Sequence, residues 1–320
     1  MRPDDPIVPD DIEEQRMREP HPFDVSYRYE IARGGEIVSW FTAGTIAPGA
    51  PGYEHKRPFF SAHADVSPAH RRHGIGASWL PLVVKLMERH GCTTFGASSE
   101  EESGHAFMRW LGADAKLFHA ENRLRLADVD WALVERWIAN GRVRSPDTRL
   151  EIYNDHVPES MREDFATQLA SLLNTIPFDD LEHGKIVVTP ESLRDWYGRM
   201  DRAKEIHYAV LAREADGEIS GMTDLVWAPY RPTMILQMFT GVKPSARGRG
   251  IGRWIKAAML DQMRPLHPET QWISTYNAES NGPMHAINGK LGFKQYRAGT
   301  EYQITRDRLA AKIRELRASS

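Results

Sequence analysis

Val242-Lys-Pro-Ser-Ala-Arg-Gly-Arg-Gly-Ile-Gly252 is the stretch of sequence that decides the fold. The apolar run at residues 234–240 predicts a buried strand before it, and the apolar spacing of residues 253–263 predicts a helix after it. A strand therefore leads through a glycine-rich loop into a helix. The first amides of a helix lack partners within the helix, and glycines let an anion approach them. Together with the loop's arginines, they indicate a site for a diphosphate.

Three kinds of phosphate loop can be compared with this stretch. A Walker loop needs Gly-Lys followed by Ser or Thr, and none follows Gly252. A dinucleotide loop needs Gly-x-Gly-x-x-Gly within a strand–helix–strand unit, whereas these glycines are Gly248, Gly250 and Gly252 and no such unit precedes them. The third pattern is Arg/Gln-x-x-Gly-x-Gly/Ala after a strand, and the loop matches it from Arg247 onward.

This third pattern resembles the acyl-CoA loop of the GNAT acetyltransferase superfamily. Downstream, residues 271–276 predict a strand, Asn281 follows that strand, and Leu291-Gly-Phe293 ends the next helical pattern. The superfamily has the same order of loop, helix, strand, Asn and Leu-Gly-Phe. The resemblance implies acetyl-CoA as co-substrate, with its pantetheine arm inserted where the strand before the loop parts from the next strand.

Composition narrows the class of protein. The chain of 320 residues suits two domains, and its 41% hydrophobic content is enough for packed cores. The net charge of −3 argues against a nucleic-acid-binding protein. The single cysteine, Cys92, excludes an internal disulfide framework. With no apolar run of membrane-spanning length and no signal-peptide pattern, we expect a cytoplasmic protein that does not bind membranes.

The loop motif occurs a second time, at residues 66–76. Six residue types recur at matching offsets: Val66, Pro68, Arg71, Gly74, Ile75 and Gly76 correspond to Val242, Pro244, Arg247, Gly250, Ile251 and Gly252. The shift between the two arginines is 247 − 71 = 176 residues. A helix pattern, a strand pattern and Leu111-Gly-Ala113 follow in the same order. An internal duplication is the best account, and it predicts two similar domains in tandem.

The predicted fold class is α/β, of the α+β kind: two tandem GNAT-like domains, each a mixed, mostly antiparallel sheet flanked by helices. Few residues precede the first hairpin, so the first copy is truncated. The predicted domains are residues 1–126, a degenerate N-terminal copy; residues 127–148, a helical linker; and residues 149–320, a complete C-terminal domain. This arrangement resembles the actinobacterial tandem acetyltransferases, the group that includes mycothiol synthase.

The first copy departs from the motif in two places. Arg72 replaces the glycine that corresponds to Gly248, and Glu101 stands where Asn281 stands in the second copy. The first copy is either a second CoA site or a structural half that has kept the fold and lost the chemistry.

The resemblance assigns CoA-binding residues one by one. Backbone groups of Thr240, Gly241 and Val242 would meet the pantetheine and the carbonyl oxygen, and Asn281 would bond to the CoA arm. The diphosphate would lie on Arg247, Gly248, Arg249, Gly250, Ile251, Gly252 and Arg253. The corresponding candidates in the first copy are Val66, Arg71, Arg72, His73, Gly74, Ile75 and Gly76. Lys256, one turn after Gly252, could also reach a phosphate.

Catalytic groups are harder to assign. The superfamily usually has a Tyr four residues before the Gly of Leu-Gly-Phe to protonate the departing thiolate, and that place holds Asn288, which is not a usable acid. Tyr276, at the end of its predicted strand, is the alternative acid, although it could equally be a core or rim aromatic. Candidate bases for the amine are Asp224, Glu279 and His207. Each of the three could also be a residue with a purely structural role.

We expect no metal, because His63, His70 and His73 lack a carboxylate or cysteine at ligand spacing. The leading hypothesis is an acetyl-CoA-dependent N-acyltransferase that acetylates a primary amine of a small molecule in its C-terminal domain. The alternative is a non-catalytic acyl-CoA-binding regulatory protein. The sequence predicts neither the acceptor nor the oligomeric state.

Overall fold

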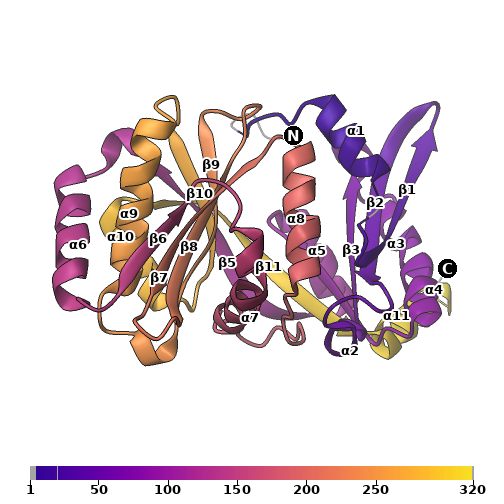
Figure 1. Ribbon diagram of the computed structural model, residues 1–320. Coiled ribbons are helices and arrows are strands. Elements are labelled where there is room, and N and C mark those ends of the chain that lie inside the picture. The colour runs from indigo at the N-terminus through magenta and orange to yellow at the C-terminus, as the bar shows by residue number, and fades with distance from the viewer. Residues whose placement is uncertain (1–4, 20, 319–320) are drawn as a thin grey trace. The chain divides into compact units, whose positions relative to one another are not determined.

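The computed structural model describes residues 5–19 and 21–318, and it divides into two compact units (Figure 1). The larger unit holds the described residues up to Arg18 together with residues 120–177 and 186–298. The smaller unit holds residues 178–185 and the described parts of residues 19–119 and 299–320. Neither unit is continuous along the sequence. Among the described residues, no helix has the length and apolar character that crossing a membrane requires.

The larger unit is built on the sheet order β5-β10-β9-β8-β7-β6. Its strands are β5 (Asp114–Arg125, of which residues 120–125 belong here), β6 (Arg149–Tyr153), β7 (Ile206–Arg213), β8 (Ile219–Trp227), β9 (Met234–Val242) and β10 (Trp272–Ala278). Its helices are α1 (Asp10–Arg18), α6 (Trp131–Arg144), α7 (Arg162–Leu173), α8 (Pro190–Arg202), α9 (Ile251–Leu266) and α10 (Gly282–Leu291). The first part of β11 (Lys294–Thr305) also belongs to it.

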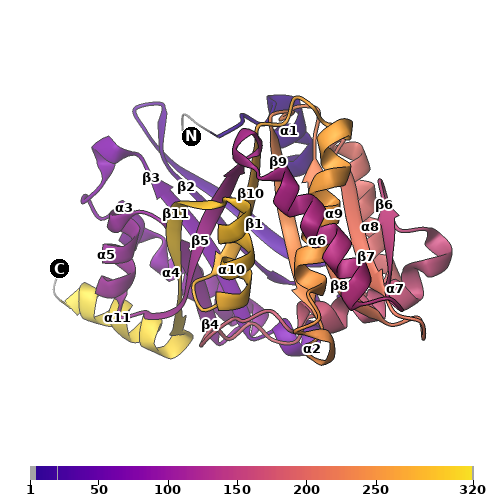
Figure 2. The same cartoon turned by 90° about the vertical axis from the view of Figure 1, so that its left-hand side faces the viewer.

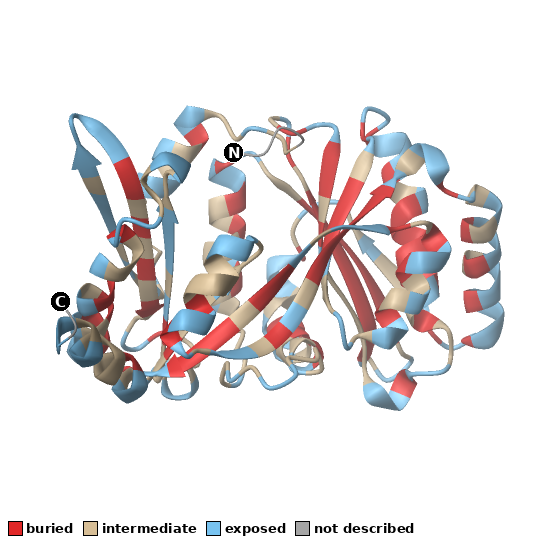
Figure 3. Ribbon diagram, turned by 180° about the vertical axis from the view of Figure 1, so that it is seen from behind, coloured by how far each residue is buried: buried red, intermediate tan, exposed pale blue. Residues whose placement is uncertain are grey.

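Both faces of this sheet are buried, because alternate side chains along its strands pack against helices on opposite sides. On β7, Tyr208 and Val210 pack with α6, α9 and α10, while the intervening Ala209 and Leu211 pack with α7 and α8. Successive strand residues point to opposite faces, so α6, α9 and α10 cover one face and α7 and α8 cover the other. Figure 2 shows α6 and α9 in front of the strands. The central strands are buried along most of their length (Figure 3).

Strands β9 and β10 part in the middle of the sheet. They pair in parallel from Met234↔Trp272 to Gln237↔Thr275 only, although β9 runs on to Val242. On its other edge β9 remains antiparallel to β8, with a bulge that leaves Met238 unpaired. The edge of β9 that faces β10 is therefore open over its last residues.

The smaller unit repeats this plan with fewer elements. Its strands are β1 (Asp24–Arg33), β2 (Glu36–Ile46), β3 (Phe59–Val66), β4 (Thr94–Ser99), residues 299–305 of β11 and residues 114–119 of β5, in the order β1-β2-β3-β4-β11-β5. Its helices are α2 (Tyr53–Lys56), α3 (Ile75–Ser78), α4 (Leu80–His90), α5 (Glu102–Leu111) and α11 (Arg306–Ala318). Strands β3 and β4 pair in parallel at three positions and then part, as β9 and β10 do.

The predicted fold class is confirmed, with mixed, mostly antiparallel pairing and flanking helices. In the smaller unit, α4 and α5 follow the loop and the next strand, as α9 and α10 do in the larger unit. Strands β5 and β11 each contribute residues to both units. The sequence boundaries at residues 126 and 149 stay a prediction about the duplicated segments.

The first loop contains a strained residue that yields a stability prediction. Arg72 has a φ of 64°, matching the φ of 82° at Gly248 in the second loop. A non-glycine residue in this left-handed region costs about 1–2 kcal/mol. We expect Arg72→Gly to raise the free energy of unfolding by about 1 kcal/mol, less what glycine adds to the flexibility of the unfolded chain. Urea denaturation measures the effect.

Arg71→Gly is the matched control for this change. The Arg71 side chain donates from Nε to the carbonyl of Val66 at 3.0 Å, and its φ of −67° needs no glycine. The control variant should therefore be less stable than the parent protein. If Arg72→Gly lowered stability as well, the first loop would not have the backbone that its sequence match to the second loop implies.

Candidate active site

The loop between β9 and α9 has the backbone geometry of an anion site. Gly248 and Gly250 have φ values of 82° and 87°, and Gly250 caps the start of α9. The buried Ala246 and Ile251 fix the two ends of the loop to the core. Within the described part of the chain, no backbone hydrogen bond uses the amides of residues 248–252. These amides and the positive end of the α9 dipole are available to a ligand.

The arginines of the loop have different surroundings. Arg247 donates from Nε to the carbonyl of Val242 at 3.3 Å and keeps its guanidinium exposed. Arg249 is bound to the Glu214 carboxylate at 3.0 Å and to the Thr148 hydroxyl at 2.6 Å. Its amide, rather than its guanidinium, is therefore the group that it offers. The Arg253 guanidinium lies 5.8 Å from the centre of the Trp137 ring.

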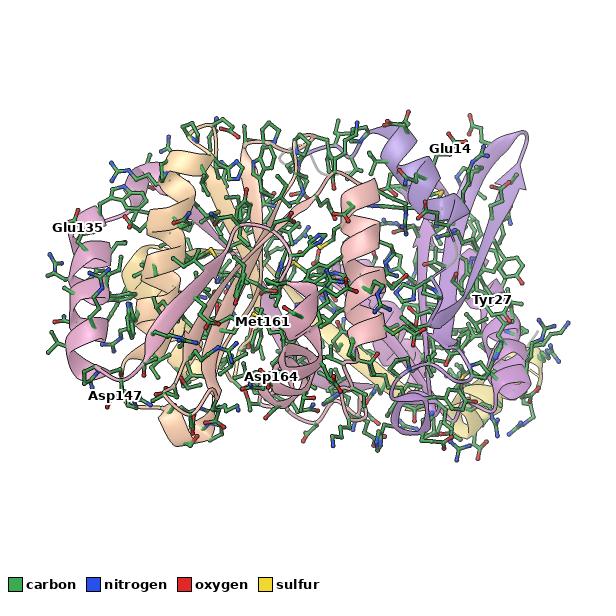
Figure 4. All side chains as sticks on the ribbon, in the orientation of Figure 1. Glu14, Tyr27, Glu135, Asp147, Met161 and Asp164 are labelled. Atoms are coloured by element: carbon green, nitrogen blue, oxygen red, sulfur yellow. The ribbon has the colours of Figure 1, made fainter. Side chains whose placement is uncertain are left out.

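Arg144 is a helix residue that contacts the loop, and the sequence did not predict this role. It lies in the last turn of α6, three residues before Asp147, which Figure 4 labels. Gly141 lets α6 approach α9 closely, because a Cβ there would come within 2.2 Å of the Trp254 ring. The approach brings the Arg144 guanidinium to the loop, where it donates to the carbonyl of Gly248 at 2.7 Å. In the sequence Arg144 lies 104 positions before Gly248, in the segment that was predicted to be a linker.

The parting of β9 and β10 exposes the residues assigned to the pantetheine arm. Thr240, Gly241 and Val242 pair with β8 but have no partner on β10 among the described residues. The Thr240 hydroxyl lies 2.7 Å from that of Thr223 and accepts a bond from the Gln237 amide at 2.8 Å. The backbone edge of β9 is thus supported on one side and open on the other.

A buried lysine occupies the point where the two strands part. Lys256 on α9 is 3% exposed, and its Nζ donates to Gln237 Oε1 and to Asn288 Oδ1, both at 2.7 Å. Its neighbours on α10 and beyond are the Met284 sulfur at 3.9 Å and the Phe293 ring at 5.0 Å. The expectation that Lys256 reaches a phosphate is therefore wrong, because its stem turns inward to two neutral amides.

Burial lowers the pKa of Lys256 to about 7. The cause is desolvation, since taking a charged amine out of water favours its neutral form. Ionisable groups with shifted pKa values that lie at a cleft are typical of functional sites. Asn288 is part of the same network, and its Nδ2 donates to Asn277 Oδ1 on β10 at 2.8 Å.

The other proposed catalytic residues have structural partners. Asp224 accepts from the Phe239 amide at 2.8 Å, which holds the bulge of β9, and its other oxygen lies 3.1 Å from Nε2 of the fully buried His207. The Tyr276 hydroxyl donates to Glu121 at 3.1 Å. Asn281 caps α10 by accepting from the Met284 amide at 3.3 Å. Glu279 is exposed.

The first loop has the same backbone and a different charge. Gly74 caps α3 with a φ of 78°, and Arg71 bonds to the carbonyl of Val66 as Arg247 does to that of Val242. Glu101, however, forms an ion pair with Arg71 at 3.0 Å. A carboxylate beside the loop's arginine repels a phosphate. Among the described residues no group of His, Cys, Asp and Glu could hold a metal, and His63 pairs with Asp65.

A pocket of about 410 Å³ lies elsewhere in the larger unit, between α6, β6 and α9. Its lining includes Ile138, Leu150 and Trp254. It lies on the side of α9 that faces α6, so it is separate from the open edge of β9.

No family model and no curated protein sequence matches the chain. Solved structures do. A tandem GNAT protein from the clavulanic acid biosynthesis pathway, solved without AcCoA, superposes with a TM-score of 0.70 at 20% identity, over 93% of this chain and 88% of its own. A GCN5-related N-acetyltransferase from Sphaerobacter thermophilus superposes with a TM-score of 0.58 at 13% identity, over 86% and 79%.

The region of a fungal multi-domain GH3 β-N-acetylglucosaminidase described as a GCN5-related glucosamine N-acetyltransferase is a third neighbour, with a TM-score of 0.57 at 13% identity. It covers 84% of this chain and 32% of its own. The chain has the GNAT fold in its tandem form, so the resemblance drawn from the loop motif is confirmed at the level of the fold. None of the three is described as a mycothiol synthase, and that narrower resemblance stays a prediction.

Proposed function

We propose that the protein is an acetyl-CoA-dependent N-acyltransferase that acetylates a primary amine of a small molecule in its larger unit. One observation carries this proposal. Strand β9 parts from β10 after Gln237 and runs directly into a loop whose amides at residues 248–252 donate to no backbone carbonyl of the described residues. An open strand edge beside an anion site fits a long thioester carrier with a diphosphate. The named functions of the structural neighbours support acyl transfer in general.

The diphosphate binds the loop amides, with charge from Arg247 and Arg144. The pantetheine arm lies along the open edge of β9 at residues 240–242, where backbone groups can bond to it. This places the thioester near the point where the strands part, beside the Lys256 network. Holding both reactants in one cleft supplies much of the rate.

The amine nitrogen attacks the thioester carbonyl, so that a C–N bond forms, the C–S bond breaks and the thiolate departs. Asn288 has no proton to give at neutral pH. Lys256 bonds to Asn288 and, with a pKa of about 7, is protonated in part of the molecules at neutral pH. We assign to Lys256 the proton that the thiolate takes up. The proton lost by the amine goes to water, and water reprotonates Lys256.

The smaller unit has a structural role, since Glu101 forms an ion pair with Arg71, the arginine of its loop. The acidic net charge favours a small-molecule acceptor over nucleic acid. A single cysteine, which is buried, fits a cytoplasmic location.

The second candidate is a CoA-binding regulatory protein without turnover. Two observations favour it: Asn288 cannot act as an acid, and the Tyr276 hydroxyl already donates its proton in a hydrogen bond to Glu121. Thiol release from acetyl-CoA, measured with a panel of primary amines, separates the two. We expect release that depends on the amine. CoA binding with no thiol release across the panel would favour the regulatory protein instead.

A further inference from the structure

A second buried polar cluster lies on the face of the larger unit's sheet that is opposite to the Lys256 network. Its centre is Glu121 on β5, which is 2% exposed and accepts from Arg123 Nε at 2.6 Å and from Ser274 Oγ at 2.6 Å. Its other oxygen accepts from the Tyr276 hydroxyl at 3.1 Å and pairs with Arg297 of β11. Three strands of the larger unit thus hold two guanidiniums around one buried carboxylate.

A second carboxylate, from the start of the chain, bridges the same two arginines. Asp5 accepts from Nη2 of Arg123 and lies 3.5 Å from Nη1 of Arg297. The Arg123 guanidinium lies 3.5 Å from the centre of the Tyr296 ring, which fixes its plane. The structure therefore already shows this pair of arginines holding a carboxylate in addition to Glu121.

The two carboxylates differ in how firmly the fold holds them. Glu121 belongs to a strand and is buried, whereas the Asp5 side chain is 30% exposed and precedes α1 in a segment without regular structure. Glu121 supplies one negative charge to the two guanidiniums, and Asp5 supplies a second. If Asp5 moved away, the cluster would gain a positive charge in a largely buried place. Another carboxylate could restore the balance through the same geometry.

The cluster lies close to the point where β9 and β10 part. Tyr276 and Asn277 are neighbours on β10, so their side chains point to opposite faces. Tyr276 belongs to the arginine cluster, and Asn277 bonds to Asn288 of the Lys256 network. No residue of β10 lies between the two clusters, because Tyr276 and Asn277 are adjacent in the chain. The described residues of β9 beyond Gln237 have no partner on β10, so an amine held by the arginines would reach the Lys256 network through this opening between the strands.

We propose that Arg123 and Arg297 form the carboxylate subsite for the acceptor, which is an amine that also carries a carboxylate, and that Asp5 occupies this subsite until the acceptor displaces it. The carboxylate site stands on the ion pairs themselves. Its use by the acceptor rests on the proposed acetyl transfer. Asp5 acts as an internal competitor, which lowers the apparent affinity by the fraction of molecules in which the subsite is filled.

Calorimetry with β-alanine and 4-aminobutyrate as probes tests the site without acetyl-CoA, and the corresponding amides are the uncharged comparison. We expect Asp5→Asn to bind the carboxylate probes at least about 5-fold more tightly than the parent chain does, because the competing charge is gone. Arg297→Gln should bind them at least about 10-fold more weakly. The matched control is Asp10→Asn, since Asp10 is an exposed acid at the start of α1, close to Asp5 in sequence and outside the cluster. It should leave the affinity unchanged.

The outcomes separate this inference from the proposed function. Asp5→Asn binding the probes no better than Asp10→Asn would overturn the subsite, even if Arg297→Gln failed to fold. Thiol release that is equal for the amino acids and their amides would leave the acetyltransferase standing and remove the carboxylate subsite. Carboxylate binding that responds to Asp5→Asn, without thiol release from any amine, would uphold the carboxylate site and sink the acetyl transfer.

Discussion

Gly250→Glu is expected to abolish CoA binding, with a loss of affinity of at least about 100-fold, or about 2.7 kcal/mol. Gly250 has a φ of 87°, which strains any residue with a side chain, and it lies at the start of α9 among the unused amides. A glutamate there adds a negative charge where the diphosphate would bind. Calorimetric titration with CoA measures the loss, and circular dichroism checks that the variant is folded.

Gly74→Glu is the matched control for this change. Gly74 occupies the corresponding place in the first loop, with a φ of 78°, so the substitution imposes a similar backbone strain. Because Glu101 already pairs with Arg71, we expect no CoA at this loop and an unchanged affinity in Gly74→Glu. An unchanged affinity in Gly250→Glu, or a loss in Gly74→Glu of the same size, would refute the assignment of the site to the second loop.

Lys256→Met should have the second large effect, on turnover rather than on binding. We expect kcat to fall about 100-fold, the lower end of what general acids contribute, while the Kd for CoA stays within a few-fold. In the parent protein kcat should decline as the pH rises through 7, because the proposed general acid is the protonated form of Lys256. The variant should lose that dependence. Lys290→Met, an exposed lysine on α10, is the control and should leave the pH profile intact.

Stability gives a check on Lys256 that needs no activity. The folded-state pKa of about 7 lies below the ordinary value of 10.5, so between these values the unfolded chain binds more protons than the folded chain. The parent protein should therefore gain stability relative to Lys256→Met as the pH rises above 7, by up to about 1.4 kcal/mol per pH unit. Urea denaturation of both proteins from pH 6.5 to 9.5 measures this difference. A constant difference would mean that Lys256 keeps an ordinary pKa.

The local features of the fold were predictable from the sequence. The loop glycines appear as a spacing because left-handed backbone at fixed positions favours glycine, as at Gly248, Gly250 and Gly292. The repeated loop motif predicted that a second part of the chain has the same order of elements. Arg72 shows the limit of this reasoning, since its backbone matches that of Gly248 although its residue type does not.

The features that decide the site's chemistry depend on contacts between distant segments. Lys256 meets its partners across 19 and 32 residues, and Asp5 meets Arg123 across 118. No local pattern records which way a long side chain turns, so Lys256 could be expected at the phosphates as readily as in the core. In the same way, the side-chain types of Asp224 and Tyr276 suit a base and an acid. In the fold, however, Asp224 accepts from the Phe239 amide at the β9 bulge, and the Tyr276 hydroxyl donates to Glu121.

The most direct test is a crystal structure of the protein with acetyl-CoA. The account predicts the diphosphate within hydrogen-bond distance of the amides of residues 248–252, and the thioester at the parting of β9 and β10 near Lys256. A complex in which these amides stayed empty while the carrier bound the first loop or another surface would contradict it.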